Sequence, residues 1–150
     1  MIYIGSDHRG FELKEKIKKY LESLDIAVND LGAYEYKEED DYNDYAEEVA
    51  KYVRLKIENL GILICGTGVG VNIVANKHKE IRSALCFNKE IAKLAREHES
   101  INIMCLPSDF INFDEAKEMV MTFIKTPFSL EEKHVKRVSR IMNLEAGGMV

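Results

Sequence analysis

The chain has 150 residues, 46% of them hydrophobic, which is enough for one domain with a sizeable core. Its 21 basic and 26 acidic residues give a net charge of −5, which disfavours non-specific contacts with nucleic-acid phosphates. No apolar run approaches the ~20 residues of a membrane-spanning helix, and the amino-terminal run turns polar after four residues. We therefore expect no nucleic-acid partner, no membrane span and no signal peptide.

The cysteine and histidine content bears on redox compartment and metal binding. The three cysteines, Cys65, Cys86 and Cys105, are far apart, and such an odd, sparse set fits a reducing cytoplasm better than a disulfide scaffold. The four histidines form no pair at metal-ligand spacing, and no CxxC motif occurs. The sequence therefore predicts a cytoplasmic protein without a metal site.

Short apolar runs alternate with longer amphipathic stretches along the chain. The apolar runs predict strands at Met1–Gly5, Ile26–Leu31, Gly61–Cys65, Arg82–Phe87 and Ile101–Leu106. Helical spacing predicts helices at Phe11–Leu24, Tyr42–Lys56, a short segment ending at Ala75, Lys89–Glu97, Phe113–Lys125 and Leu130–Asn143. This alternation predicts an α/β, three-layer Rossmann-like fold: a five-stranded parallel sheet with helices on both faces.

No repeat or linker divides the chain. We expect residues 1–145 to form a single domain and residues 146–150, which contain two glycines, to form a flexible tail. The acidic run Glu35–Glu48 is interpreted as a solvated loop and helix start.

A glycine-rich turn follows the third predicted strand, at the edge of a parallel sheet where ligands bind. Gly66, Gly68 and Gly70 allow backbone amides to point at a bound anion, so the turn predicts an oxyanion or phosphate cradle. Close packing of a helix on the sheet is the alternative explanation. The GxGxG spacing disfavours a dinucleotide site, and the first loop, Gly5–Gly10, lacks the Lys-Ser/Thr of a P-loop.

Cys65 ends the third strand and enters this turn. An inert core cysteine is the commoner role of a buried free thiol. At a helix amino terminus, however, the helix dipole favours the thiolate, which can act as a nucleophile or a base. Cys86 and Cys105 lie within predicted strands and are expected to belong to the core.

Three further groups carry polar chemistry. Asp7 and His8 place a carboxylate beside an imidazole in the first loop. His98 closes a helix, where it could equally be a partner of the helix dipole. The last predicted helix holds Lys133, Arg137 and Arg140 on one face, which is either a solvated face or an anion clamp.

Three segments together resemble one protein family. They are Ile4-Gly5-Ser6-Asp7-His8-Arg9-Gly10-Phe11, Gly61-Ile62-Leu63-Ile64-Cys65-Gly66-Thr67-Gly68-Val69-Gly70 and Ala75-Asn76-Lys77. They resemble the type B ribose-5-phosphate isomerases and the related galactose-6-phosphate isomerase subunits, and the resemblance extends from residue 1 to about 144. It implies interconversion of aldose and ketose sugar phosphates without metal or cofactor.

The resemblance also implies roles for individual residues. Cys65 matches the base that moves a proton between two sugar carbons through a cis-enediolate, Thr67 a proton shuttle between the oxygens, and His98 the ring-opening residue. The backbone of Gly66, Gly68, Val69 and Gly70 would stabilise the enediolate.

Substrate contacts and assembly follow from the same resemblance. Asp7 and Tyr42 match contacts to sugar hydroxyls, and His8 and Arg137 match contacts to phosphate. The family places its site at a dimer interface, so we expect a homodimer or tetramer with the His98 region supplied by the partner chain.

The sequence departs from the family pattern at the phosphate end. The usual His-Asn is His98-Glu99, the usual Gly-x-Arg after the fifth strand is Pro107-Ser108-Asp109, and Lys133 replaces an arginine, which loses bidentate binding. An acidic residue in place of arginine changes the charge beside the phosphate dianion by two units, each worth about 4 kcal/mol at ~4 Å and an effective dielectric of ~20. We therefore expect phosphate to bind poorly there unless other cations compensate.

Three functions remain open from the sequence. Isomerisation of ribose 5-phosphate is the default. Glu99 and Asp109 could instead accept hydrogen bonds from a longer or unphosphorylated aldose. A non-catalytic sugar- or anion-binding module on the same fold is the third possibility.

Overall fold

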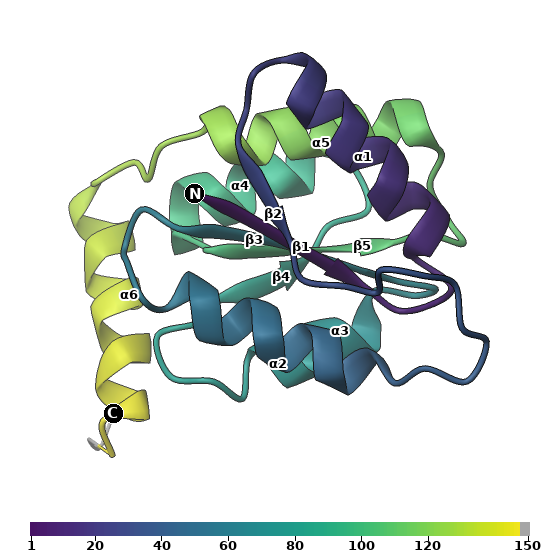
Figure 1. The fold of residues 1–150 in the computed structure, drawn as a ribbon. Coiled ribbons are helices and arrows are strands. Elements are labelled where there is room, and N and C mark those ends of the chain that lie inside the picture. The colour runs from purple at the N-terminus through teal and green to yellow at the C-terminus, as the bar shows by residue number, and fades with distance from the viewer. Residues whose placement is uncertain (148–150) are drawn as a thin grey trace.

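The computed structural model describes residues 1–147 and contains a five-stranded parallel sheet covered by helices (Figure 1). The strand order is β2-β1-β3-β5-β4, and every neighbouring pair is parallel. The strands are β1 (Ile2–Ser6), β2 (Val28–Asp30), β3 (Leu60–Cys65), β4 (Ser83–Leu85) and β5 (Ile103–Pro107). The predicted α/β class and the parallel five-stranded sheet are confirmed.

Helices cover both faces of this sheet. They are α1 (Phe11–Ser23), α2 (Tyr42–Val53), α3 (Val69–Ala75), α4 (Lys89–Glu99), α5 (Phe113–Lys125) and α6 (Glu132–Glu145). One core cluster joins α1, α4 and α5 to the sheet, and a second joins α2 and α3 to the opposite face. In Figure 1, α6 stands apart at the left, beside α4.

The central strand β3 shows why this sheet is buried on both faces. All six of its residues are buried, and successive side chains point to opposite faces because a strand has a period of two. Ile62 and Ile64 enter the cluster under α1, α4 and α5, whereas Leu63 and Cys65 enter the cluster under α2 and α3. The alternation therefore fixes the Cys65 side chain on the face where α3 begins.

Several predicted elements differ from the structure at their ends. The edge strands β2 and β4 are three residues long, shorter than the predicted Ile26–Leu31 and Arg82–Phe87, because an edge strand is paired along one side only. Helix α6 begins at Glu132 rather than at Leu130, because Leu130 has a left-handed φ of 57° that a helix cannot include. Of the predicted tail 146–150, residues 148–150 lie outside the described part of the chain.

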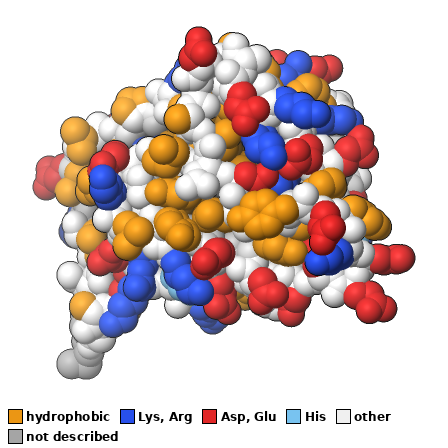
Figure 2. All heavy atoms as spheres, viewed as in Figure 1, with side chains coloured by type: hydrophobic (Ala, Val, Ile, Leu, Met, Phe, Trp, Pro, Cys, Tyr) orange, Lys and Arg blue, Asp and Glu red, His pale blue; other side chains and the backbone are white. Residues whose placement is uncertain are grey.

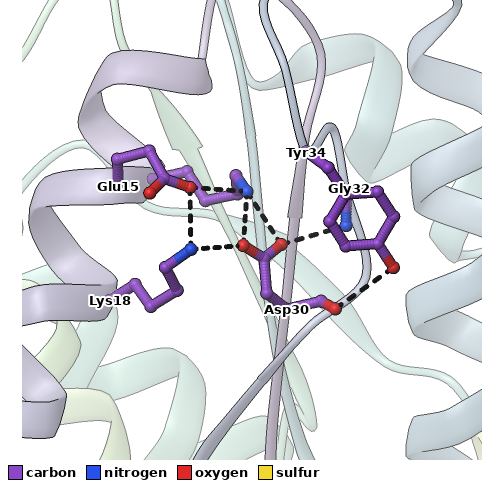
Figure 3. A network of polar contacts seen from close by, with 6 residues as sticks. Glu15, Lys18, Asp30, Gly32 and Tyr34 are labelled. Atoms are coloured by element: carbon purple, nitrogen blue, oxygen red, sulfur yellow. Dashed lines mark hydrogen bonds and ion pairs between the residues drawn. The ribbon is translucent and has the colours of Figure 1, made fainter.

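A buried network of charges fastens α1 to the end of β2 (Figure 3). Lys14 has a fully buried side chain, and its Nζ lies 2.7 and 2.8 Å from the two carboxylate oxygens of Asp30 and 3.0 Å from Glu15. Lys18 bridges the same two carboxylates, and the Gly32 amide donates to Asp30 Oδ1 at 3.0 Å. Every donor of the Lys14 ammonium thus has an acidic acceptor.

The surface agrees with the predicted solvation of the acidic run. Tyr34–Glu39 is exposed, and Figure 2 shows acidic side chains gathered at the lower right of the view, where this loop and the start of α2 lie in Figure 1. Within residues 1–147, no helix combines the length and apolar character that crossing a bilayer requires.

Candidate functional site

The loops after β1, β3 and β5 meet at the carboxyl edge of the sheet. The Asp7 amide donates to the Ile64 carbonyl at 3.3 Å, and the amides of Ser108 and Asp109 donate to the carbonyls of Cys65 and Gly66 at 3.0 Å each. These backbone hydrogen bonds fix the three loops to one another. The edge is therefore a preformed surface on which polar side chains converge, as expected for ligand binding in parallel sheets.

Cys65 lies at the centre of this edge. Its side chain is only 5% exposed, and its Sγ accepts a hydrogen bond from the Gly68 amide at 3.1 Å. Gly68 has a φ of 69°, a left-handed conformation that brings its amide back toward the sulfur and begins α3. A charged sulfur here would therefore have a backbone donor already in place.

The other two cysteines differ from Cys65. Burial raises the pKa of the Cys86 thiol to about 12, and burial also raises the pKa of the Cys105 thiol. Cys105 lies inside β5, and Cys86 lies just after β4 rather than within it as predicted, hydrogen-bonded through its amide to the Cys105 carbonyl. Both are fully buried core residues.

The glycine-rich turn is shaped by its neighbours. A Cβ atom at Gly66 would lie 2.5 Å from Arg9 Nε, and one at Gly70 would lie 2.7 Å from the ring of Tyr42. Thr67 is exposed, and its hydroxyl accepts from the Val69 amide at 3.3 Å. The turn thus brings Cys65, Thr67 and Tyr42 to one surface, and close packing of neighbours accounts for part of its glycine content.

Asp7 and His8 extend the same surface. Burial raises the pKa of Asp7, against the lowering effect of the Gly10 amide, which donates to Asp7 Oδ1 at 3.0 Å. His8 is held by Asp40, whose Oδ1 accepts from the His8 amide at 3.0 Å and lies 2.7 Å from His8 Nδ1. Sequence analysis missed Asp40, because a single acid among eight in a loop 32 residues away gives no spacing signal.

Arg9 and Asp109 form an ion pair across this edge, between the β1 and β5 loops. The sequence predicts that Asp109 weakens phosphate binding unless other cations compensate; the structure shows that Arg9 is a cation paired with Asp109, and the effect on phosphate stays a prediction. Arg9 was missed because its partner lies a hundred residues away. The signal that the sequence offered for Arg9 was its position in the loop after β1, between Asp7-His8 and Gly10.

A second group of predicted residues surrounds the end of α4. The rings of His98 and His134 lie 4.2 Å apart at an angle of 31°, and Ser129 Oγ lies 2.6 Å from His134 Nδ1. His134 is 2% exposed, so the His98 ring lies against a buried histidine. The sequence contained a signal for His134, because it precedes the buried Val138 by four residues on the same helix face.

The basic residues of α6 lie beside this second group. Lys133 and Arg137 are exposed, and Lys133 Nζ pairs with Glu131 at 2.9 Å. The Glu99 carbonyl accepts a hydrogen bond from the Arg82 guanidinium at 3.2 Å, and Glu99 lines a cavity between α4 and α6 with Ile141 and Leu144.

The two groups lie at opposite ends of the strands, the first at their carboxyl ends and the second near their amino ends. Asn102, four residues after His98, is level with Gly61, because its carbonyl accepts from the Gly61 amide at 2.8 Å. Gly61 and Cys65 are four strand residues apart, or roughly 13 Å at ~3.3 Å per residue. In Figure 1 the loops after β1 and β3 lie to the right and α6 to the left. One chain therefore brings Asp7, His8, Tyr42, Cys65 and Thr67 together, but not with His98, Glu99, Lys133 and Arg137.

Fold and edge together define an α/β protein whose carboxyl-edge loops carry a cysteine, a glycine-rich turn and an aspartate-histidine pair. Residues 2–141 match the family model described as Ribose/Galactose Isomerase, and the chain belongs to that family. A Mycoplasma pneumoniae protein named "probable ribose-5-phosphate isomerase B" is 44% identical over 144 residues, which are 96% of this chain and 94% of that protein.

Solved structures agree with this assignment. Ribose-5-phosphate isomerase B from Mycoplasma genitalium, crystallised with bound ribulose-5-phosphate, has a TM-score of 0.93 at 40% identity and covers 97% of this chain and 95% of its own. The enzyme from Thermotoga maritima has a TM-score of 0.90 at 44% identity, covering 95% of this chain and 97% of its own.

Proposed function

We propose that this chain is an aldose-ketose isomerase that interconverts ribose 5-phosphate and ribulose 5-phosphate, with Cys65 as the base. The single observation that carries the proposal is the position of the Cys65 sulfur. It lies at the carboxyl edge, receives the Gly68 amide at 3.1 Å, and is surrounded by the Asp7-His8 loop and the glycine-rich turn. The names of the relatives, and the ketose bound in the Mycoplasma genitalium structure, support this choice of reaction and substrate.

The chemistry follows from the residues at this edge. After ring opening, assigned to His98, the Cys65 thiolate removes the proton on C2 of the aldose, and the C2–H electron pair forms the C1–C2 double bond of a cis-enediolate. The carbonyl electrons move onto O1, and the Thr67 hydroxyl passes a proton from O2 to O1. Return of the proton from Cys65 to C1 completes the ketose without any net change in oxidation level.

Backbone amides stabilise the negative charge in this scheme. The Gly68 amide already donates to the sulfur and the Val69 amide to the Thr67 hydroxyl, so the amides of Gly66 and Gly70 are left for the enediolate oxygens. Preorganised donors of this kind act where charge develops in the transition state. Asp7 and Tyr42 would bind sugar hydroxyls, and His8, held by Asp40, would face the phosphate.

The complete site would require two copies of the chain. Cys65 and His98 lie at opposite ends of the strands of one sheet, so ring opening and proton transfer on one sugar need His98 from a second copy. A two-fold dimer satisfies this requirement twice, because each copy supplies one residue to each site. Lys133, Arg137 and Glu99 would enter the same site with the partner's His98.

The base is tested by an aldose-ketose conversion assay with ribose 5-phosphate. We expect Cys65→Ala to lower kcat by roughly a thousandfold or more, because the general base is lost. Cys86→Ala, which removes an equally buried sulfur outside the site, is the control and should stay within about threefold of wild type. A Cys65→Ala enzyme as fast as the wild type would refute Cys65 as the base.

The composite site is tested by mixing two inactive variants. Cys65→Ala and His98→Ala homodimers each lack one residue in both sites, but a mixed dimer contains one intact site. Subunit exchange at equal amounts should restore about a quarter of wild-type activity, since half the dimers are mixed and each has one working site of two. No recovery, despite exchange shown by mass-tagged subunits, would place both residues in a single-chain site.

A further inference from the structure

The loops after β1, β3 and β5 contain a single permanently charged cation. Among residues 7–10, 66–70 and 108–112, which follow β1, β3 and β5, Arg9 is the only lysine or arginine. Asp7 and Asp109 lie in the same loops, and Asp40 reaches His8 from the loop after β2, whose Lys37 is exposed and paired with Glu35. A doubly negative ligand beside Cys65 would therefore depend on Arg9 for compensating charge from this chain.

Arg9 is held through both its side chain and its backbone. Asp109 binds its Nη2, and Ser108, the preceding residue, donates from its hydroxyl to the Arg9 carbonyl at 3.0 Å. The guanidinium lies over the backbone of Gly66, where a Cβ atom would be 2.5 Å from Nε and 2.6 Å from Cζ. The missing side chain at Gly66 thus makes room for the guanidinium directly after Cys65.

Part of this guanidinium remains available to a ligand. The Arg9 side chain is 54% exposed, and within residues 1–147 no protein acceptor is assigned to its Nε or Nη1 hydrogens. A guanidinium presents five N–H donors in a planar fork that suits the oxygens of phosphate. Asp109 binds Nη2, and the planar guanidinium holds the remaining N–H donors, on Nε and Nη1, in a fixed orientation.

We propose that Arg9, oriented by Asp109, binds the phosphate group of the sugar substrate and selects phosphorylated sugars. This inference rests on the proposed isomerase function for the identity of the sugar, but not for the recognition of phosphate. It gives Asp109 the role of a positioning residue. It also reverses the expectation that the acidic residue at 109 weakens phosphate binding, because Asp109 holds the cation that the phosphate needs.

The test compares Arg9→Ala with Lys16→Ala. Lys16 is a matched control, because it is 51% exposed and pairs with Glu12 at 2.6 Å on the outer face of α1. For Arg9→Ala we expect KM for ribose 5-phosphate, and the Kd of inorganic phosphate measured by calorimetry, to rise about tenfold to a hundredfold, as for a lost charge-assisted hydrogen bond. Lys16→Ala should leave both constants within about twofold of wild type.

A charge exchange tests the role of Asp109. Arg9→Asp alone places two carboxylates side by side and should weaken phosphate binding further than Arg9→Ala. Adding Asp109→Arg restores the pair with its members exchanged, and we expect it to recover at least tenfold of the lost phosphate affinity, a non-additive result that requires contact between the two residues. Strictly additive effects would overturn the assignment of Asp109.

Three outcomes separate this inference from the proposed function. If wild-type protein fails to isomerise ribose 5-phosphate but binds inorganic phosphate through Arg9, the inference stands and the substrate assignment fails. If the wild type is active and Arg9→Ala leaves phosphate binding unchanged, the inference is wrong. It is equally wrong if Arg9→Ala changes only kcat and the rate of Cys65 alkylation by iodoacetamide, because Arg9 would then act on the sulfur.

Discussion

Two ion pairs in this molecule use the same chemistry in opposite surroundings. Lys14 is fully buried, and its ammonium donates to Asp30 and Glu15 (Figure 3). Arg9 is half exposed, and within residues 1–147 its guanidinium has one acidic partner, Asp109. The first pair joins a helix to a strand, and the second joins two loops at the carboxyl edge.

The difference shows what to expect of each pair. A buried ammonium whose acceptors are all supplied by the protein contributes to folding and has no donor left for a ligand, whereas removal of either partner leaves an uncompensated charge in the core. An exposed pair contributes little to stability, because water and salt screen it. Its unused donors are free to bind a ligand, so its effect should appear in affinity.

The largest expected effect on stability comes from breaking the buried pair. Lys14→Ala removes the one fully buried ammonium and leaves the partly exposed Asp30 with Lys18 as its cation, so we expect the free energy of unfolding to fall by about 3 kcal/mol, the lower end for a broken buried pair. Urea denaturation at neutral pH measures it. Lys16→Ala, two residues further along the same helix, removes an exposed lysine and should cost less than about 1 kcal/mol. Equal losses in the two variants would show that the buried network does not stabilise the fold.

The second expected effect is that the stability contributed by two aspartates, Asp30 and Asp7, depends on pH with opposite sign. Burial alone would raise the pKa of Asp30, but the ammonium groups of Lys14 and Lys18 outweigh it and lower that pKa below 3.8. The stability contributed by Asp30 is therefore present above about pH 4 and is lost as the pH falls through its folded-state pKa. The difference in the free energy of unfolding between wild type and Asp30→Asn should therefore become smaller as the pH falls.

The stability contributed by Asp7 should have the opposite pH dependence. Burial raises its pKa above 3.8, so its contribution to stability is complete below about pH 4 and is lost as the pH rises through the folded-state value. Asp7→Asn should therefore gain stability relative to wild type as the pH rises. Urea titrations of wild type and both variants between pH 3 and pH 7 measure these differences, and parallel curves for the two variants would contradict both assignments.

The smallest expected effect is on the stability of the exposed pair. Arg9→Ala should change the free energy of unfolding by less than about 1 kcal/mol, even though it weakens phosphate binding strongly. Thermal unfolding of both proteins without ligand measures the change in intrinsic stability. A second measurement with saturating inorganic phosphate measures binding, because phosphate should stabilise the wild type more than Arg9→Ala. A loss as large as that of Lys14→Ala would make Arg9 a structural residue.

The sequence predicted the fold well because hydrophobic periodicity records the core. The run Gly61–Cys65 is apolar throughout and became the fully buried β3, and Phe113–Lys125 matched α5 at both ends. Lys14 was missed as a buried residue, although it lies three residues after Phe11 and three before Ile17 on the apolar face of α1. A charge at such a position signals a buried ion pair.

The site was predicted unevenly, for a physical reason. Cys65 and the glycine-rich turn are contiguous in sequence, so their spacing reports their geometry. The partners of His8 and Arg9 are Asp40 and Asp109, which only the folded chain brings near. Spacing along the chain does not record such contacts. The roles of His98, Glu99, Lys133 and Arg137 depend on a second copy and stay predictions.

The three glycines after Cys65 are each fitted to a side chain from another part of the chain. Gly66 packs against Arg9, Gly68 against Leu85, and Gly70 against the ring of Tyr42. A methyl group added at any one of them would therefore displace a residue of a distant segment. Alanine at 70 would thus move Tyr42, and alanine at 66 would move the Arg9-Asp109 pair, without changing the identity of any of these residues, whereas alanine at 68 would also strain a left-handed backbone.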